Sequence, residues 1–335
     1  MTELPKYDGV LVLPRMMIQN VNCISSSFTW GFPSVTALMG FMWAMQRNCR
    51  DKEIMFEDVL FKGVGVVCHD LSPQVHKNNF IHTFNLTRNP LDHQGKTAPI
   101  VEEGRAHLNI SLLLAYEGEA HDFPNKYRDA MLRIVRDALV AMRVAGGTIL
   151  PPRYKSQEPR FIGLAEAENL RTQFVVERRR FLPGFALVSR DDLLAEHLLY
   201  LRGQDPDSSL LDAWLDLSRW NSRAEKQEEV VGDTGLAAGR VEWKREKREG
   251  WIVPIPVGYA SISELYQAGE VLNARDASTP FRFVESVYSM GQWIGPHRLQ
   301  EVGELLWFAH VDDQKGLYRC YNIYGDLRGA EKECE

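Results

Sequence analysis

Residues 19–34 read Gln-Asn-Val-Asn-Cys-Ile-Ser-Ser-Ser-Phe-Thr-Trp-Gly-Phe-Pro-Ser and join two apolar segments of the chain. Residues 10–13 have the length and β-branching of a buried strand, and residues 35–45 are long enough for a helix, which Pro33 and Ser34 would start. Asn and Ser side chains in the junction can simply close turns and cap the helix, but sixteen such residues exceed what one turn and one cap require. Amides, hydroxyls, N–H groups at a helix start and aromatic faces also hold a phosphate backbone and a base, so this stretch is a candidate RNA site.

Composition places the chain among ordinary soluble globular proteins. Its 335 residues are enough for one large core or two smaller ones, and 44% hydrophobic and 25% charged residues are typical proportions. No apolar run reaches the roughly 18 residues of a membrane span, and the amino-terminus has no signal-peptide pattern. Five cysteines without CxxC spacing fit reduced thiols rather than a disulfide frame or structural zinc. We therefore expect a cytoplasmic protein without membrane contact, metal or cofactor. A net charge of −6 excludes coating of DNA by bulk charge but permits a local basic face.

Segment patterns in the first 150 residues predict an α+β fold. They indicate, in order, a strand, a helix, a strand at 59–68, a long connection at 71–104, a strand at 107–116, an amphipathic helix from Pro124 and a short strand after Gly146 and Gly147. This order is that of a ferredoxin-like or RRM-like unit, an antiparallel sheet with two helices on one face. Aromatic RNP sequences are missing, so RNA would be held by loops and edges rather than stacked on the sheet.

We divide the chain into three parts on pattern and composition. Residues 1–155 form the RRM-like core, with 71–104 as a protruding thumb arm that lacks apolar periodicity. Residues 156–240 form a helical insertion, with helices expected at 191–201 and 210–220, followed by a flexible linker. Residues 241–335 form a β-rich extension that packs on the core. Within these parts the arginine triplet at 178–180 is expected in extended chain, and prolines are expected to keep residues 251–259 off a central strand.

Catalytic and metal-binding patterns are weak in this sequence. It contains no GxSxG, HExxH, P-loop or kinase motif, and six of its nine histidines lie between 69 and 121 at spacings that match no ligand pattern. An acid–base role in RNA cleavage would fall to His107, His297 or Tyr288, none of which sits in a recognisable pair. A histidine beside an arginine is more often an RNA contact or a buried group with its hydrogen bonds satisfied.

Longer motifs resemble one known family. Residues 13–15 (Leu-Pro-Arg), the stretch at 19–34 and residues 84–91 (Phe-Asn-Leu-Thr-Arg-Asn-Pro-Leu) closely resemble the Cas-five-type subunit of the Csy complex in type I-F CRISPR systems, a member of the RAMP superfamily. The resemblance runs from residue 10 to residue 320 and includes the segments 101–107, 145–147, 182–190, 253–256, 273–276, 296–298 and 315–319. Differences concentrate in 222–240 and in the last dozen residues.

The resemblance implies a non-catalytic RNA-binding subunit of a surveillance (Cascade) complex in antiviral defence, which grips the 5′ handle of CRISPR RNA. It implies an RRM-like fold with a thumb, pairing with the large subunit, contact with the first backbone subunit, target DNA nearby, and RNA processing by a separate nuclease. Candidate RNA-binding residues are Arg15, Gln19, Asn20, Asn22, Ser25, Ser26, Trp30, Asn85, Arg88, Arg105, Gly146, Gly147, Gln292, His297 and Arg298. The arginines Arg178, Arg179 and Arg180 are assigned to a partner subunit.

Two other functions remain open from the sequence. Cas-five-type relatives in another CRISPR subtype cut RNA, so the resemblance also permits a metal-independent CRISPR RNA-processing endoribonuclease. The acidic net charge and the many aromatic residues permit a protein-only scaffold.

Overall fold

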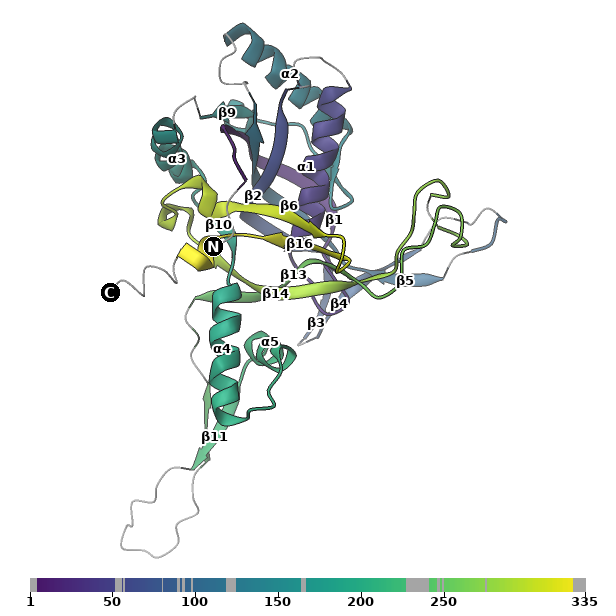
Figure 1. The fold of residues 1–335 in the computed structure, drawn as a ribbon, viewed down its shortest axis with the longest axis vertical. Coiled ribbons are helices and arrows are strands. Elements are labelled where there is room, and N and C mark those ends of the chain that lie inside the picture. The colour runs from purple at the N-terminus through teal and green to yellow at the C-terminus, as the bar shows by residue number, and fades with distance from the viewer. Residues whose placement is uncertain are drawn as a thin grey trace, which may run out of the picture.

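One antiparallel sheet of eleven strands runs through the molecule (Figure 1). The computed structural model describes residues 5–51, 56, 58–79, 81–88, 91, 94–97, 99–118, 125–163, 167–226, 241–245, 248, 250–274 and 276–327. The sheet consists of β1 (Gly9–Asn22), β2 (Leu60–Pro73), β6 (Arg105–Glu117), β7 (Arg143–Val144), β8 (Gly147–Ile149), β9 (Arg160–Ile162), β10 (Phe185–Ser189), β13 (Trp251–Ser261), β14 (Val284–Ile294), β15 (Leu306–Asp312) and β16 (Leu317–Tyr321). Its path is β10-β14-β13-β16-β15-β2-β6-β1-β8-β7, and β9 pairs with β1. The expected α+β class with a large antiparallel sheet is confirmed.

Helices lie on both sides of this sheet. The α-helices are α1 (Val35–Arg50), α2 (Asn125–Ala141), α3 (Ala167–Arg180), α4 (Asp191–Gln204) and α5 (Leu210–Ser218). Short 3₁₀ turns follow as η3 (Lys155–Gln157), η4 (Pro296–Arg298) and η5 (Val302–Leu305). The predicted helices at 35–45, 191–201 and 210–220 are therefore present as α1, α4 and α5.

Strand β1 is longer than its sequence pattern predicts. It runs to Asn22, so Gln19 and Asn20 lie in a strand and not in the expected loop. β1 pairs with β6 on one side and with β8 and β9 on the other. Its register against β6 shifts after Leu13 and again after Ile18, and such bulges interrupt the alternation by which a strand is recognised in a sequence.

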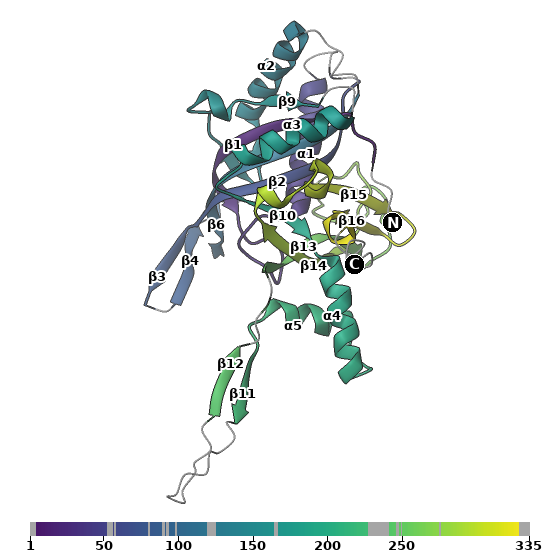
Figure 2. The ribbon, with the colours of Figure 1, turned by 90° about the vertical axis from the view of Figure 1, so that its left-hand side faces the viewer.

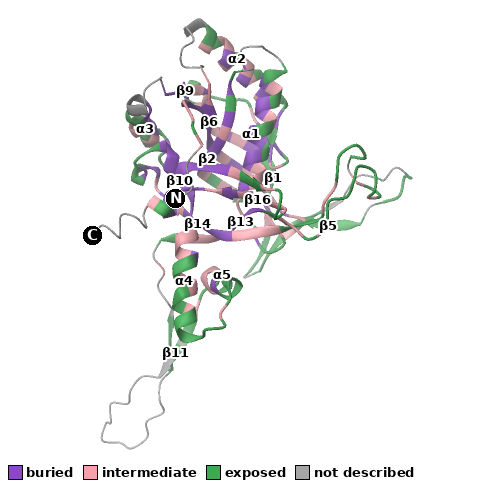
Figure 3. Ribbon diagram, viewed as in Figure 1, coloured by how far each residue is buried: buried purple, intermediate pink, exposed green. Residues whose placement is uncertain are grey.

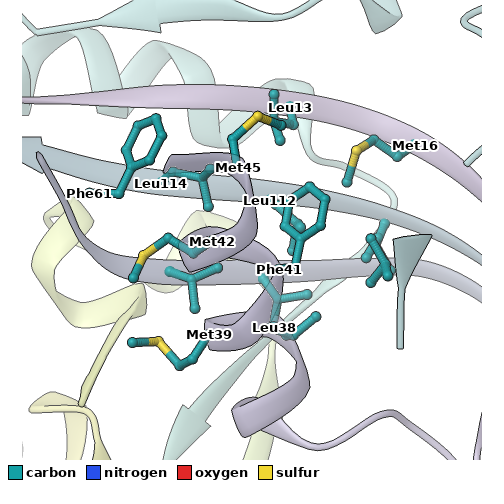
Figure 4. Close-up of a cluster of buried hydrophobic side chains, with 14 of the residues drawn as sticks. Leu13, Met16, Leu38, Met39, Phe41, Met42, Met45, Phe61, Leu112 and Leu114 are labelled. Atoms are coloured by element: carbon teal, nitrogen blue, oxygen red, sulfur yellow. The ribbon is translucent and has the colours of Figure 1, made fainter. Parts of the chain in front are cut away.

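Strands β2, β6, β1 and β8 lie side by side in that order, and one face of this group packs on α1 and α2. Leu13 and Leu112 from the strands meet Leu38 and Met42 from α1 in this core (Figure 4). All four side chains are buried, and Val135 of α2 extends the same cluster. Helix α1 begins here because Ser34 caps it and its apolar positions recur at helical spacing towards the sheet.

The opposite face of the same strands is also covered. Val12 and Leu113 point into a second cluster with Phe174 of α3, Val188 of β10 and Phe308 of β15. Figure 3 shows the central strands mostly buried, while α4, α5 and the projecting strands are largely exposed. A sheet covered on both faces leaves its edges and loops as the places where a large ligand can bind.

The arm at 71–104 is built of strands, contrary to the expectation of a connection without structure of its own. β2 continues to Pro73, and β3 (Val75–Asn78), β4 (Ile81–Arg88) and β5 (Ile100–Glu103) form a three-stranded sheet that projects from the large one (Figures 1 and 2). Ile81 and Leu86 of β4 are exposed. Apart from Phe84, which packs against the main core, the described side chains of β3 and β4 are largely exposed. Their sequence therefore carries no burial pattern that would reveal the strands.

Strand β13 is not at an edge of the sheet, so the expectation that prolines keep residues 251–259 off a central strand is wrong. β13 lies between β14 and β16 in the sheet. Pro254 and Pro256 pair only with β14, because β16 pairs with Gly258, Tyr259 and Ala260 beyond them. The prolines therefore occupy a segment with one paired side, where a missing N–H is tolerated.

The arginine triplet lies in a helix rather than in extended chain. It forms the last turn of α3, where basic side chains are favoured by the helix dipole. Glu177, one residue earlier, is buried and pairs with Arg160 and Arg180. Charged residues dominate this helix, so its apolar periodicity is too weak to identify it.

The carboxy-terminal half adds a peripheral unit to the sheet. Helices α4 and α5 pack on β14 through Leu194, Ala213, Trp214 and Met290. The hairpin β11 (Ser222–Lys226) and β12 (Val241–Arg245) extends beyond them (Figure 2). Most of the expected linker, residues 227–240, lies outside the described residues. The division of the chain into three parts stays a prediction.

Leu112→Ala should lower the free energy of unfolding by about 2–5 kcal/mol, because Leu112 is fully buried between the sheet and its helices. Urea denaturation followed by circular dichroism measures this change. Val140→Ala on α2 is the control, since that side chain is 76% exposed and its loss should change stability by less than about 0.5 kcal/mol. Equal losses in the two variants would contradict this placement of the core.

Candidate nucleic-acid interface

Polar side chains converge where β1 and β6 meet the base of the arm. Arg105 Nη2 lies 2.7 Å from a carboxylate oxygen of Glu103, and Arg105 Nη1 donates a 3.4 Å hydrogen bond to the backbone oxygen of Asn20. Gln74 connects β2 to β3; its amide nitrogen donates to Asn20 Oδ1 at 2.5 Å and lies 3.2 Å from His107 Nε2. We call Asn20, Gln74, Arg105 and His107 the arm-base cluster.

Asn20 has an unusual backbone conformation within this cluster. Its φ of 58° lies in the left-handed region, which Asn tolerates better than most residues. The Asn20 N–H donates to His107 Nδ1 at 3.4 Å, while its carbonyl accepts from Arg105. Two side chains of β6 thus bind the N–H and the carbonyl of Asn20 at the bulge in β1. The Asn20 side chain is exposed at the surface.

Two glycines bring β8 against the same end of β1. A Cβ on Gly147 would lie 2.7 Å from the backbone oxygen of Gln19 and 2.6 Å from a Val21 methyl group, so only glycine permits this approach. Gly146 has a φ of 79°, and a Cβ there would have only Arg105 Nη1 within 4 Å, at 3.9 Å. The structure therefore places Gln19, Gly146 and Gly147 beside the arm-base cluster.

The turn after β1 is closed by its own polar side chains. The Asn22 amide donates to the Ile24 carbonyl at 3.0 Å and accepts from the Ile24 N–H at 3.1 Å. The hydroxyls of Ser25 and Ser26 lie 2.8 and 2.7 Å from Thr29 Oγ1, and Ser26 Oγ also accepts from the Thr29 N–H. Asn22, Ser25 and Ser26 therefore shape the turn whatever else they contact. Thr29, which is buried, was not recognised from the sequence.

Aromatic residues connect this turn to neighbouring elements. Trp30, 60% exposed, meets Phe84 of β4 edge to face with ring centroids 5.4 Å apart. Phe28 packs against Tyr288 of β14 at 5.8 Å. The candidate Asn85 follows Phe84 on β4 and is exposed, while the side chain of Arg88 lies outside the described part of the molecule.

Arg15 belongs to a different network on β1. The Arg15 guanidinium donates to the carbonyl of Leu182 at 2.7 Å, and the backbone N–H of Arg15 donates to Ser111 Oγ at 2.9 Å. His69 contacts the same hydroxyl through Nε2 at 2.7 Å and the Pro183 carbonyl through Nδ1 at 2.8 Å. Burial lowers the pKa of His69, although the hydrogen bond to Pro183 opposes that shift. This network ties β1, β2 and β6 to the loop before β10.

The remaining candidates lie near β14 and η4, which are not neighbours of β1. Gln292 is buried and accepts a hydrogen bond from Arg190. His297 and Arg298 are exposed in η4, and Arg178 of α3 donates to the carbonyl of Leu299 next to them. The structure therefore brings the arginine triplet close to η4 but does not join this group to the arm-base cluster.

Comparison with known proteins identifies the family of this chain. A family model for the CRISPR-associated protein Cas_Csy2 matches residues 11–320. The chain belongs to the Csy2 family. The CRISPR-associated protein Csy2 of Pseudomonas aeruginosa (strain UCBPP-PA14) is 44% identical over 320 residues, which cover 93% of this chain and 94% of that relative. The resemblance to a Csy-complex subunit of type I-F CRISPR systems is thereby confirmed.

For this Csy2-family chain, the predicted site residues fall into three groups. Gln19, Asn20, Arg105, Gly146 and Gly147 gather at the arm base. Asn22, Ser25, Ser26 and Trp30 form the adjoining turn, and Arg15, Gln292, His297 and Arg298 lie elsewhere. The sequence reading missed Gln74, whose only signal is its position directly after the apolar strand β2.

Metal and membrane sites are not found in the described ranges of this Csy2-family chain. No group of three or more His, Cys, Asp or Glu side chains there is arranged to hold a metal ion. No described helix is both long and apolar enough to span a membrane.

Asn22→Ala should lower the free energy of unfolding by about 0.5–1.5 kcal/mol, because it removes both side-chain hydrogen bonds that close the turn at Ile24. Thermal and urea unfolding measure the loss. Ser27→Ala at the exposed tip of the same turn is the matched control and should leave stability unchanged. An unaffected Asn22→Ala variant would free this side chain for a purely ligand-binding role.

Proposed function

We propose that this protein is a non-catalytic RNA-binding subunit that grips the 5′ handle of CRISPR RNA in a type I-F surveillance complex. The observation that carries the proposal is the gathering of Asn20, Gln74, Arg105 and His107 at the base of a projecting arm, in a chain of the Csy2 family. Amide, imidazole and guanidinium groups at a strand end supply donors and acceptors for base edges, 2′-hydroxyls and phosphates.

The fold supports an RRM-like reading of residues 1–155. The strand order β8-β1-β6-β2, with α1 after β1 and α2 after β6, is that of a ferredoxin-like unit with both helices on one face. The face that RRM domains use for base stacking is here covered by α3 and β10. RNA therefore contacts the strand ends, the turn at 22–30 and the arm as the thumb.

Each part of the arm base suits one task in RNA binding. Arg105 is part-exposed, and its ion pair with Glu103 fixes the orientation of the guanidinium. The exposed part of the guanidinium can then donate to a phosphate. Asn20 and Gln74 present amides that read base edges, and open space beside Gly146 admits the RNA backbone close to Arg105. Arg105 supplies a local cationic group at this surface, which a chain of net charge −6 needs in order to hold a polyanion.

The same proposal assigns partners to other surfaces. We place the large subunit of the Csy complex at Arg178, Arg179 and Arg180 beside η4, and the first backbone subunit along the arm. Arg179 and Arg180 are exposed, while Arg178 is partly used within the fold. Target DNA passes nearby in the assembled complex, and the protein works in the cytoplasm.

An RNA-cleaving role has less support from the geometry. His107 Nδ1 accepts from the backbone N–H of Asn20, which places the proton of the neutral ring on Nε2 beside Gln74, so neither ring nitrogen is free to act as a base. The Tyr288 hydroxyl is buried between other side chains, and His297 stands on η4, away from β6. Incubation of the purified protein with repeat RNA in the absence of metal should leave the RNA intact, and specific cleavage would favour a nuclease instead.

Arg105→Gln should weaken binding of handle RNA and flatten the slope of log affinity against log salt by about 0.7, because one phosphate contact to a single strand is lost. Fluorescence anisotropy at a series of salt concentrations measures both quantities. Arg133→Gln on the exposed face of α2 is the charge-matched control and should keep the wild-type slope. No binding of handle RNA to the wild-type protein, alone or in its complex, would instead favour a protein-only scaffold.

Asn20→Gly and Asn20→Ala should separate backbone strain from RNA contact. The alanine variant should lose about 1–2 kcal/mol of stability, because an L side chain without a local hydrogen bond is disfavoured at φ 58°, whereas glycine adopts that conformation freely. Both variants lack the amide, so both should bind handle RNA less tightly. A glycine variant with full RNA affinity would remove Asn20 from the interface.

A further inference from the structure

An aromatic cleft lies next to the turn at 22–30, and the arm-base cluster does not use it. Its walls come from the turn, β2, β10, β13 and β14, and its volume is about 440 Å³, within the range of about 300–1,000 Å³ that small-molecule sites occupy. The rings that line it are those of Trp30, Phe32, Phe185, Trp251 and Trp293. They come from four segments far apart in the sequence, so no sequence motif announces the cleft.

The rings support one another and leave faces free. Phe32 meets Trp293 edge to face with ring centroids 5.0 Å apart, and Phe185 meets Trp251 with centroids 5.3 Å apart. The centroids of Trp251 and Trp293 lie 6.1 Å apart. Trp251 is nonetheless 55% exposed and Phe185 46% exposed. Large rings held in place by their neighbours and open to water are suited to stack a flat aromatic ligand.

One carboxylate stands among these rings. Asp70 lines the cleft from β2, where it pairs with Asn109 of β6 directly after the register shift at His69. Among the described residues Asp70 makes no ion pair, and its side chain is exposed. The neighbouring His69 is unavailable to a ligand, since its nitrogens contact Ser111 and Pro183. The Asp70 carboxylate is thus an acceptor in the lining of the cleft for which the described structure shows no ion-pair partner.

We propose that this cleft holds one unstacked nucleobase that carries an exocyclic amino group, with Asp70 accepting a hydrogen bond from that group. Cytosine is the simplest such base, because its N4 amine is a donor where uracil presents an acceptor oxygen. This inference rests on the proposed function, since it assigns a base of the bound CRISPR RNA to a second subsite.

Continuity with the candidate RNA surface favours a base over a partner protein. Trp30 lines the cleft and also packs on Phe84 of the arm, so RNA that follows the turn reaches the cleft directly. An apolar side chain from another subunit would fill the ring-lined space but leave the Asp70 carboxylate desolvated without a donor, which is unfavourable. A base with an amine satisfies both features of the site.

The test compares short RNAs and photocrosslinks on the full-length protein. Labelled hexanucleotides of cytidine and of uridine are titrated by fluorescence anisotropy, and we expect tighter binding of the cytidine hexamer. Trp251→Leu should weaken cytidine binding about tenfold, because a stacking face is lost. Asp70→Asn should reduce the preference for cytidine over uridine while keeping most of the affinity. Trp243→Leu, an exposed tryptophan on β12 outside the cleft, is the matched control and should bind normally.

A crosslink on the unaltered protein keeps the test independent of folding in the variants. A hexamer with one 5-iodocytidine is irradiated with wild-type protein, and we expect the adduct on the peptide that contains Trp251 or Trp293. Handle RNA bound equally well by wild type and Trp251→Leu, with crosslinks only at other residues, would overturn the cleft assignment and leave the RNA-binding function intact. Wild-type protein that binds no RNA, together with loss of a partner subunit in Trp251→Leu, would overturn both and make the cleft a protein-docking site.

Discussion

The pairing of β1 with β6 is the constraint on which the rest of the structure depends. It spans Gly9 to Asn22 and is interrupted by two bulges. Each bulge contains a residue with positive φ, Arg15 at 45° and Asn20 at 58°. The carbonyls and N–H groups released there accept and donate hydrogen bonds to side chains of β6 and its neighbours, so the same irregularities that break the ladder create the polar networks.

Coverage of both sheet faces decides where ligands can bind. The helices α1 and α2 bury one face of the central strands, and α3 with β10 and β15 buries the other. Burial on this scale stabilises the sheet through the hydrophobic effect, and it also removes the flat surface that an RRM-like domain ordinarily offers to bases. Around strands β2, β6, β1 and β8, the described residues that stay open are those of the strand ends, the turn at 22–30 and the arm.

The turn at 22–30 links the two proposed RNA subsites. The hydroxyls of Ser25 and Ser26 form hydrogen bonds with Thr29 that close the turn. These hydrogen bonds position Trp30, the next residue along the chain. Trp30 then touches Phe84 of the arm on one side and lines the aromatic cleft on the other. The Trp30 side chain, which the sequence marks as a candidate stacking face, thus connects the arm to the wall of the cleft.

The sequence by itself determined the α+β class, the helices at 35–45, 191–201 and 210–220, the strand that became β6, and the family. Each of these elements buries one apolar face, and the spacing of its apolar residues can be recognised within the segment itself. The family is recognised from long motifs that occur in the same order along the chain. The sequence did not determine the strands of the arm, because those strands pair through backbone groups and most of their side chains are not buried. It did not determine the central place of β13 either, because β13 pairs with β16 only beyond its prolines. Nor could it place Arg178 in a helix, since the α3 contacts that stabilise that helix lie on β9 and η4. The arm-base cluster needed the tertiary structure for the same reason. Asn20, Gln74 and Arg105 are far apart along the chain, and only strand pairing and its bulges bring them within hydrogen-bond distance.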